Sequence, residues 1–224
     1  MDTFDQKRRA FGAEAAEAYR RFAEQGLFEP QTDLYVYQTA VRHAPELMLV
    51  GINPGGNGHK GICDTEGTVG GTYNAYVDCR DEHPWFTRLY NLFDTPCLRP
   101  LLERCVGTNE YFINTGSANG LPHAIELRRM ATTLVRKLAD EVIEPERIIT
   151  LGRDVFASLC NTPSPAPVRF GEVLFRYGYR RRPDGRMIPV GYLCNPSPRN
   201  ARYFAGGKTA DWQRALEWFL TELH

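Results

Sequence analysis

Residues 46–55 read Glu46-Leu-Met-Leu-Val-Gly-Ile-Asn-Pro-Gly55, a short apolar run that ends in glycine and a Pro-Gly turn. A continuous apolar run of this length is typical of a strand covered on both faces, as in a parallel sheet. Proline then fixes one backbone angle, and the glycines of Gly51-Ile-Asn-Pro-Gly-Gly-Asn-Gly58 let backbone N–H groups approach a ligand. The stretch predicts a buried strand that ends in a binding loop.

Further strands and helices are predicted around this strand. The strands are Tyr111-Phe-Ile-Asn114, Arg147-Ile-Ile-Thr-Leu-Gly152 and Met187-Ile-Pro-Val-Gly-Tyr-Leu193. A helical period of apolar residues predicts helices over Phe4–Phe22, about His123–Val142 and Asp211–Leu223. A Pro-Asp-Gly turn predicts a hairpin near Arg180–Gly185. Alternating strands and helices predict an α/β fold, a three-layer α/β/α sandwich with a central, mainly parallel four-stranded sheet.

Composition limits the class of protein. The chain has 224 residues, of which 42% are apolar, enough for one buried core. No apolar run approaches the roughly 20 residues of a membrane helix, and residues 1–8 lack the apolar core of a signal peptide. The six cysteines include no C-x-x-C pair, so we expect buried thiols and no metal site. A cytoplasmic protein without membrane contact is predicted.

Charge is distributed unevenly along the chain. Lys plus Arg and Asp plus Glu are both 27, but residues 1–146 hold 15 basic and 21 acidic residues, whereas residues 147–224 hold 12 and 6. A basic surface for a polyanion fits this asymmetry. A solvated arginine-rich loop fits it equally well.

Three of the four predicted strands end in an asparagine, namely Asn53, Asn114 and Asn195. Ligands of open α/β sheets bind at the carboxyl ends of the strands. We therefore expect the site at this edge, with Asn114 as a base-reading amide or as a cap of the sheet end. The loop contains neither G-x-x-x-x-G-K-[ST] nor G-x-G-x-x-G, which argues against a nucleotide cofactor.

Two segments, Gly51-Ile-Asn-Pro-Gly55 and Asn195-Pro-Ser-Pro-Arg-Asn200, resemble the signature motifs of the uracil-DNA glycosylase superfamily. The first resembles the mismatch-specific branch. The second resembles the single-strand-selective monofunctional branch, except that Asn195 stands where that branch has histidine. Phe112-Ile-Asn114 fits the family's strand with a base-reading asparagine, and the resemblance covers Glu46–Lys208.

The resemblance implies a hydrolase, a monofunctional DNA glycosylase that removes uracil or another deaminated base from DNA without a cofactor or metal. It implies a single domain over residues 1–224, acting as a monomer, with a helical extension at 1–44 and a family-like core at 45–210. Asn53 would hold the attacking water, and Asn195 would donate to the departing base. Asn114 would match O4 and N3–H of uracil, since an amide offers both an acceptor and a donor.

The remaining predicted site residues line the base or contact DNA. The substrate group adds Gly51, Ile52, Pro54, Gly55 and Tyr73. Gly55 would leave room for 5-substituted uracils or serve only the turn, and Tyr73 is favoured as the stacking platform over Tyr76, Trp85 and Phe86. The DNA contacts are Ser197, Pro198, Arg199, Asn200 and Lys208, with Arg202 in the same basic stretch. Alternatively, Arg199 and Arg202 begin the last helix and pair with its neighbours.

Two other functions stay open. Neither Asp nor His occupies the two catalytic positions, as in a binding module that has lost turnover. The zero net charge also fits a hydrolase of free nucleotides or nucleosides.

Overall fold

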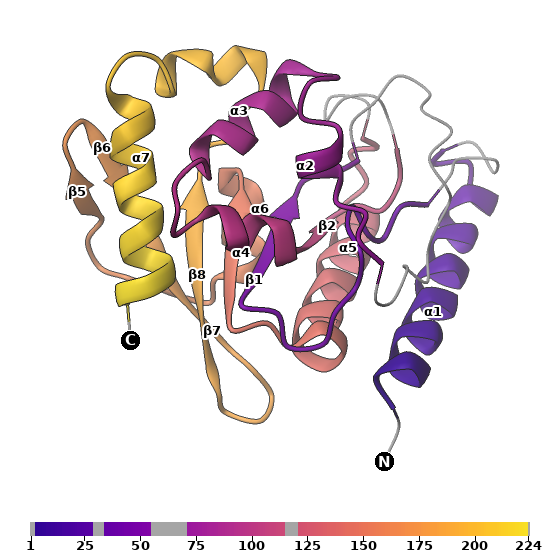
Figure 1. The fold of residues 1–224 in the computed structure, drawn as a ribbon. Coiled ribbons are helices and arrows are strands. Elements are labelled where there is room, and N and C mark those ends of the chain that lie inside the picture. The colour runs from indigo at the N-terminus through magenta and orange to yellow at the C-terminus, as the bar shows by residue number, and fades with distance from the viewer. Residues whose placement is uncertain (1–2, 29–33, 55–70, 115–120, 224) are drawn as a thin grey trace.

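The computed structural model describes residues 3–28, 34–54, 71–114 and 121–223, and shows an α/β fold (Figure 1). Within these ranges one sheet contains six strands in the order β2-β1-β3-β8-β7-β4. The strands are β1 (Leu47–Gly51), β2 (Val106–Asn109), β3 (Arg147–Leu151), β4 (Thr162–Pro163), β7 (Tyr177–Arg181) and β8 (Met187–Leu193). The first four in sheet order are parallel to one another, and β7 is antiparallel to both of its neighbours, β8 and β4. The sheet is therefore larger than the four strands predicted.

Helices and a small hairpin surround the sheet. The helices are α1 (Phe4–Glu24), α2 (Ala75–Asp78), α3 (Pro84–Leu92), α4 (Arg99–Arg104), α5 (Ile125–Lys137), α6 (Arg153–Leu159) and α7 (Lys208–Glu217). Two π-helical segments, η2 (Leu138–Ile143) and η4 (Trp218–Glu222), extend α5 and α7, and η3 (Pro198–Tyr203) is a 3₁₀ helix. Strands β5 (Val168–Phe170) and β6 (Val173–Phe175) pair separately. Thr3 and Gln6 form a capping box that fixes the start of α1.

The second parallel strand is not where the apolar pattern predicted it. Strand β2 is Val106–Asn109, and the prediction of Tyr111–Asn114 was wrong. The ring of Phe112 packs against Phe11 and Tyr19 of α1, and the Phe112 N–H donates to Tyr19 Oη at 2.9 Å. The apolar signal of this segment comes from burial under α1 rather than from the sheet.

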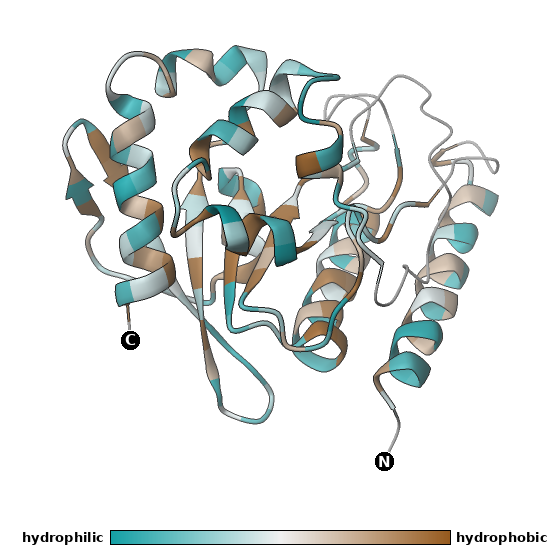
Figure 2. Cartoon of the chain, in the orientation of Figure 1, coloured by the Kyte–Doolittle hydropathy of each residue, from teal (hydrophilic) through white to brown (hydrophobic). Residues whose placement is uncertain are grey.

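Strand β1 is buried on both faces, as predicted. Met48 and Val50 join an apolar cluster with α1 and α5, whereas Leu47 and Leu49 join a second cluster with α3, α4 and α7. Figure 2 shows hydrophobic residues on the central strands and hydrophilic residues on the outer sides of the helices. Burial of both faces holds the strand ends in fixed positions.

Residues before β1 include more than the predicted helix. Residues Leu34 and Tyr37 form antiparallel bridges with Ile113 and Thr108, so this segment lies along β2.

The predicted hairpin before β8 is confirmed by the pairing of Arg181 with Met187. In the described ranges, no helix is long and apolar enough to cross a membrane.

Candidate functional site

The carboxyl ends of the four parallel strands form one edge of the sheet, here called the carboxyl edge. Gly51 pairs with Asn109 at the ends of β1 and β2, and Leu151 pairs with Leu193 at the ends of β3 and β8. Asn53 follows β1 by two residues, and Asn195 follows β8 by two residues. Two motifs that are far apart in the sequence therefore lie at the same edge.

Asn195 accepts three hydrogen bonds from N–H donors of the described residues. Its Oδ1 accepts from Trp85 Nε1 at 2.9 Å and from the Ser197 N–H at 3.1 Å, and its backbone oxygen accepts from Asn200 Nδ2 at 2.9 Å. No described residue accepts a hydrogen bond from Asn195 Nδ2. Because the acceptor end of the amide is occupied twice, the end that remains for a ligand is a donor.

Asn53 is half-buried between a core residue and a buried proline. Ile52 packs against the apolar cluster under α1 and α5, and Pro54 is buried. Asn53 Nδ2 donates to the Pro54 carbonyl at 3.2 Å, which orients the amide. Gly55, predicted to line the base, lies outside the described residues.

Asn114 lies at the end of the segment that follows β2. It is half-buried, and the preceding residue, Ile113, pairs with Leu34. The segment leaves β2 beside the loop of Asn53, because the Tyr111 N–H donates to the Ile52 carbonyl at 2.8 Å. The segment that carries Asn114 thus begins beside the loop of Asn53.

Sequence reasoning missed Asn109, the true last residue of β2. It is 6% exposed, and its Nδ2 has no hydrogen-bond partner among the described residues. A Cβ at Gly51 would clash with Asn109 Oδ1, so glycine is required there for the close packing of this amide. The Thr-Asn pair after Val106 could have indicated the end of a strand. The segment Tyr111–Ile113 is more apolar and was therefore predicted as the strand instead.

A buried carboxylate stands next to Asn109. Glu110 is 1% exposed, and its Oε1 accepts from Thr132 Oγ1 at 2.7 Å and from Ser158 Oγ at 2.5 Å. These hydroxyls come from α5 and α6. Glu110 therefore fixes two helices against the carboxyl edge, a role that sequence reasoning did not foresee.

Among the four aromatic residues considered, Trp85 rather than Tyr73 contacts one of the three asparagines. Tyr73 is 56% exposed, its hydroxyl lies 3.8 Å from Cys79 Sγ, and its backbone bonds Ala40 near the start of β2. Tyr76 is buried over Gly107. Trp85 bonds Asn195 and packs edge-on against Phe86, with 5.1 Å between ring centroids. The structure does not bring Tyr73 to the asparagines.

Two titratable residues precede Asn195. Burial raises the pKa of Tyr192 to about 12, with Cys194 adding to the shift, and burial also raises the pKa of Cys194. Both groups therefore stay protonated at neutral pH, and neither supplies a base. In the described part of the chain, His, Cys, Asp and Glu side chains form no group of three that could hold a metal ion.

The predicted DNA contacts divide into two groups. Ser197 donates its backbone N–H to Asn195 Oδ1, and Pro198, Arg199 and Asn200 begin η3, with Pro198 and Arg199 exposed. Lys208 instead starts α7 and pairs with Glu172 at 3.4 Å.

Arg199 and Arg202 lie in η3, before the last helix rather than in it, and neither forms an ion pair with a described carboxylate. The Arg202 guanidinium stacks 5.0 Å from the Tyr203 ring centroid. The alternative that these two arginines begin the last helix and pair there is therefore wrong. Arg88 of α3, not foreseen, donates to the Pro196 carbonyl at 3.3 Å.

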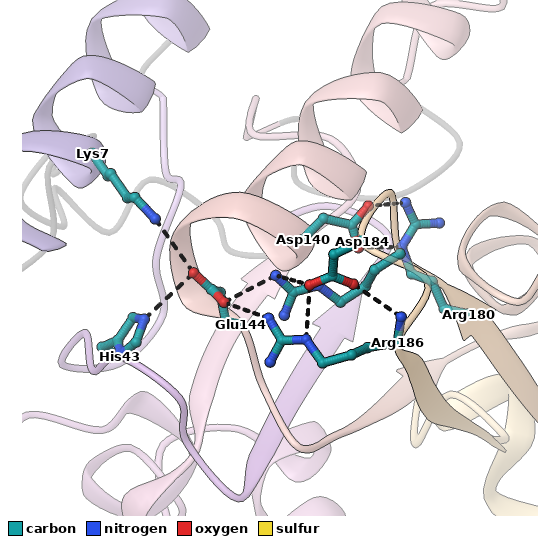
Figure 3. Close-up of polar contacts among 8 residues, drawn as sticks. Lys7, His43, Asp140, Glu144, Arg180, Asp184 and Arg186 are labelled. Carbon is teal, nitrogen blue, oxygen red and sulfur yellow. Dashed lines mark hydrogen bonds and ion pairs between the residues drawn. The ribbon is translucent and has the colours of Figure 1, made fainter. Parts of the chain in front are cut away.

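Much of the basic excess of the second half is neutralised at the opposite, amino edge (Figure 3). Glu144 accepts from Arg182 at 2.9 Å and Arg186 at 3.1 Å, and it also lies 3.4 Å from Lys7 Nζ and 3.5 Å from His43 Nε2. Arg180 pairs with Asp140 at 2.5 Å, and both are buried. The arginine-rich hairpin is thus an ion-pair network within the fold.

Comparison with models of known protein families and with curated proteins finds no match to this chain.

Proposed function

We propose that the protein is a monofunctional DNA glycosylase that hydrolyses the N-glycosidic bond of uracil, or of a related deaminated base, in DNA. The observation that supports the proposal is that Asn53 and Asn195 follow the carboxyl ends of β1 and β8, with Asn114 on the segment after β2, and that the Asn195 amide accepts a hydrogen bond from Trp85. The three-layer arrangement implied by the resemblance agrees with the apolar clusters on both faces of the sheet. No cofactor is required for the reaction.

In the proposed reaction a water attacks C1′ of the deoxyribose while the C1′–N bond breaks. The base takes the bonding electrons and leaves as an anion, which is then protonated by solvent, and the water loses a proton to solvent. Asn53 positions the water through its carbonyl oxygen, because the amide nitrogen is directed to the Pro54 carbonyl. An amide cannot take a proton as a true base, so catalysis relies on position and on stabilisation of the base anion.

Asn195 supplies that stabilisation. Its Oδ1 is occupied by Trp85 and Ser197, so its Nδ2 presents donors to the base O2 without a change of rotamer. A donor held before the reaction needs no reorganisation when charge develops. Asn114 reads O4 and N3–H of the flipped base, and Trp85 replaces Tyr73 as the proposed stacking platform.

A binding module without turnover is the second candidate. The observation that favours it is that both proposed catalytic groups are amides, which do not ionise. In that case the site at the carboxyl edge binds a flipped base and releases it unchanged.

The test uses oligonucleotides that contain uracil, hypoxanthine, xanthine or hydroxymethyluracil, each as a single strand and as a duplex. Alkali then cleaves abasic sites, and the cleaved fraction measures excision. We expect excision of uracil by the parent and a loss of about 10²-fold or more in Asn53→Ala. The matched control is Asn91→Ala, which removes an exposed asparagine amide that makes no hydrogen bond to a described residue.

The outcomes separate the candidates. Binding of uracil-containing DNA without abasic sites would support the binding module. Asn53→Ala activity within a few-fold of the parent would refute the role of Asn53. Release of base from nucleosides alone would point to a nucleoside hydrolase.

A further inference from the structure

The first turns of α5 present an exposed stripe of three side chains. Ile125 is 63% exposed, and Arg128 and Arg129 are exposed as well. The spacing i, i+3, i+4 puts the three on one side of the helix. Leu127 and Ala131, on the other side, are buried in the core. The stripe is therefore a surface feature of a firmly packed helix.

The two arginines of the stripe form no ion pair with the acidic residues that the structure describes. No described carboxylate oxygen lies within 4.0 Å of Arg128 or Arg129, although Glu126 is on the same turn. On α1, by contrast, Arg20 pairs with Glu24 at 2.7 Å and Arg21 pairs with Glu17 at 3.0 Å. The stripe joins two full positive charges to an exposed apolar side chain, a combination suited to a polyanion with apolar faces.

The stripe lies at the carboxyl edge, across the site from η3. Helix α5 follows the end of β2, whereas η3 follows the end of β8, and β1 with its Asn53 loop lies between those two strands. From β2 to β8 there are three strand spacings of about 4.8 Å, or roughly 14 Å. A DNA strand rises 3.4 Å per nucleotide, so this span corresponds to about four nucleotides. The stripe and η3 thus stand at the two ends of the parallel part of the sheet, on opposite faces of it.

Arg128 also lies close enough to Tyr111 for its charge to act on the phenol. Its charge lowers the pKa of Tyr111, which burial, together with Glu110, raises overall. Tyr111 belongs to the segment that leads to Asn114. The positive charge of Arg128 thus acts on Tyr111, in the segment that leads to Asn114, a predicted base-reading residue.

We infer that the stripe Ile125–Arg128–Arg129 is a second DNA-contacting surface, which holds the backbone on the opposite side of the target nucleotide from η3. This inference rests on the proposed function. The arginines contact phosphates, and Ile125 packs on sugar or base faces. DNA is then held at two points, and the nucleotide between them is the one placed over Asn53.

The test compares the parent with R128Q/R129Q and with the control R42Q/R181Q. Arg42 and Arg181 lie at the amino edge and have no carboxylate partner among the described residues, so both pairs remove the same charge. Binding of a uracil-containing oligonucleotide and of an undamaged one is followed by fluorescence anisotropy at several salt concentrations. Excision is measured in parallel at low and at saturating DNA.

In R128Q/R129Q we expect the slope of log K against log salt to become shallower by about 1.4 to 1.8, since each lost phosphate contact contributes about 0.7 to 0.9. Binding should weaken equally for damaged and undamaged DNA. The KM of excision should rise with kcat unchanged, because uniform binding is removed. The control should keep the parent's slope.

Failure of the inference and failure of the proposed function look different. If the parent binds and excises but R128Q/R129Q keeps the parent's slope, the second surface is refuted and the glycosylase stands. If the parent binds without excision and the slope still falls, the surface stands and the glycosylase does not. A parent that binds no DNA refutes both. Circular dichroism confirms that the variants fold, which is expected because all four arginines lie outside the apolar core.

Discussion

Replacing Glu144 by glutamine should weaken the fold strongly at neutral pH and only slightly in acid. Glu144 is 17% exposed and receives Arg182, Arg186 and Lys7 on one carboxylate. Burial alone would raise the pKa of Glu144, but the hydrogen bonds and charge of these bases outweigh it and hold the pKa at about 2 instead of 4.5. At 1.36 kcal/mol per unit, the difference corresponds to roughly 3 kcal/mol of unfolding free energy.

The stabilisation by Glu144 decreases as pH falls, because its carboxyl has a lower pKa in the folded protein than in the unfolded chain. The contribution is complete above pH 4.5 and is lost as pH falls toward 2, so about 1 kcal/mol remains near pH 3. Urea unfolding of the parent and E144Q at pH 7 and pH 3 measures both values. E141Q is the control, since Glu141 is an exposed carboxylate on the same segment without a described basic partner. Equal losses in E144Q and E141Q at pH 7, or a loss in E144Q that does not shrink in acid, would refute the reasoning.

Three further changes test the site and the sheet. Asn195→His should speed uracil release by about tenfold, since a polarised ring donor stabilises an anion more than an amide does; single-turnover excision decides, and a slower rate in a folded variant argues against contact with the base. Gly55→Tyr should abolish excision of hydroxymethyluracil and spare uracil, whereas equal loss of both would mean that Gly55 serves only the turn. Gly178→Ala should lower the free energy of unfolding by about 1 to 3 kcal/mol, because its Cβ would lie 2.6 Å from Pro163 Cα and Thr162 O. Urea unfolding measures this, and an unchanged midpoint would show that β4 can move away without cost.

The strands that the sequence predicted well are those in which burial on two faces leaves a continuous apolar run. Residues 47–51 and 147–151 are of this kind. Strand β2 escaped prediction because Val106 is its one large apolar residue. The predicted hairpin found only the turn after β7 and not the extent of that strand, because Tyr177–Arg181 mixes glycine, tyrosine and arginine. Strand β4 was not predicted, because it has only two residues. Edge pairing of this sort depends on the partner strand and leaves little signal in its own sequence.

For the site, strand prediction was enough to put Asn53 and Asn195 at one edge, because they follow the parallel strands β1 and β8, which end together. Asn114 was expected there as the end of a strand, but it lies on the segment after β2 and is not a strand residue. The contacts that orient Asn195 could not be predicted from the sequence. The donor to Asn195 comes from Trp85, 110 residues away, and the order of four nearby aromatics gave no reason to choose it over Tyr73. Contacts of this kind are set by how α3 packs on the sheet.

The hydrogen bond from the Trp85 indole to Asn195 affects the fluorescence of this tryptophan. The chain has three tryptophans, and Trp212 and Trp218 pack against Phe175 on the other side of α7 from solvent. Indole emission shifts in wavelength and intensity with the polarity and hydrogen bonding of its surroundings. With Trp212 and Trp218 replaced by phenylalanine, the emission of Trp85 would report ligand binding beside Asn195 directly, in an unlabelled protein.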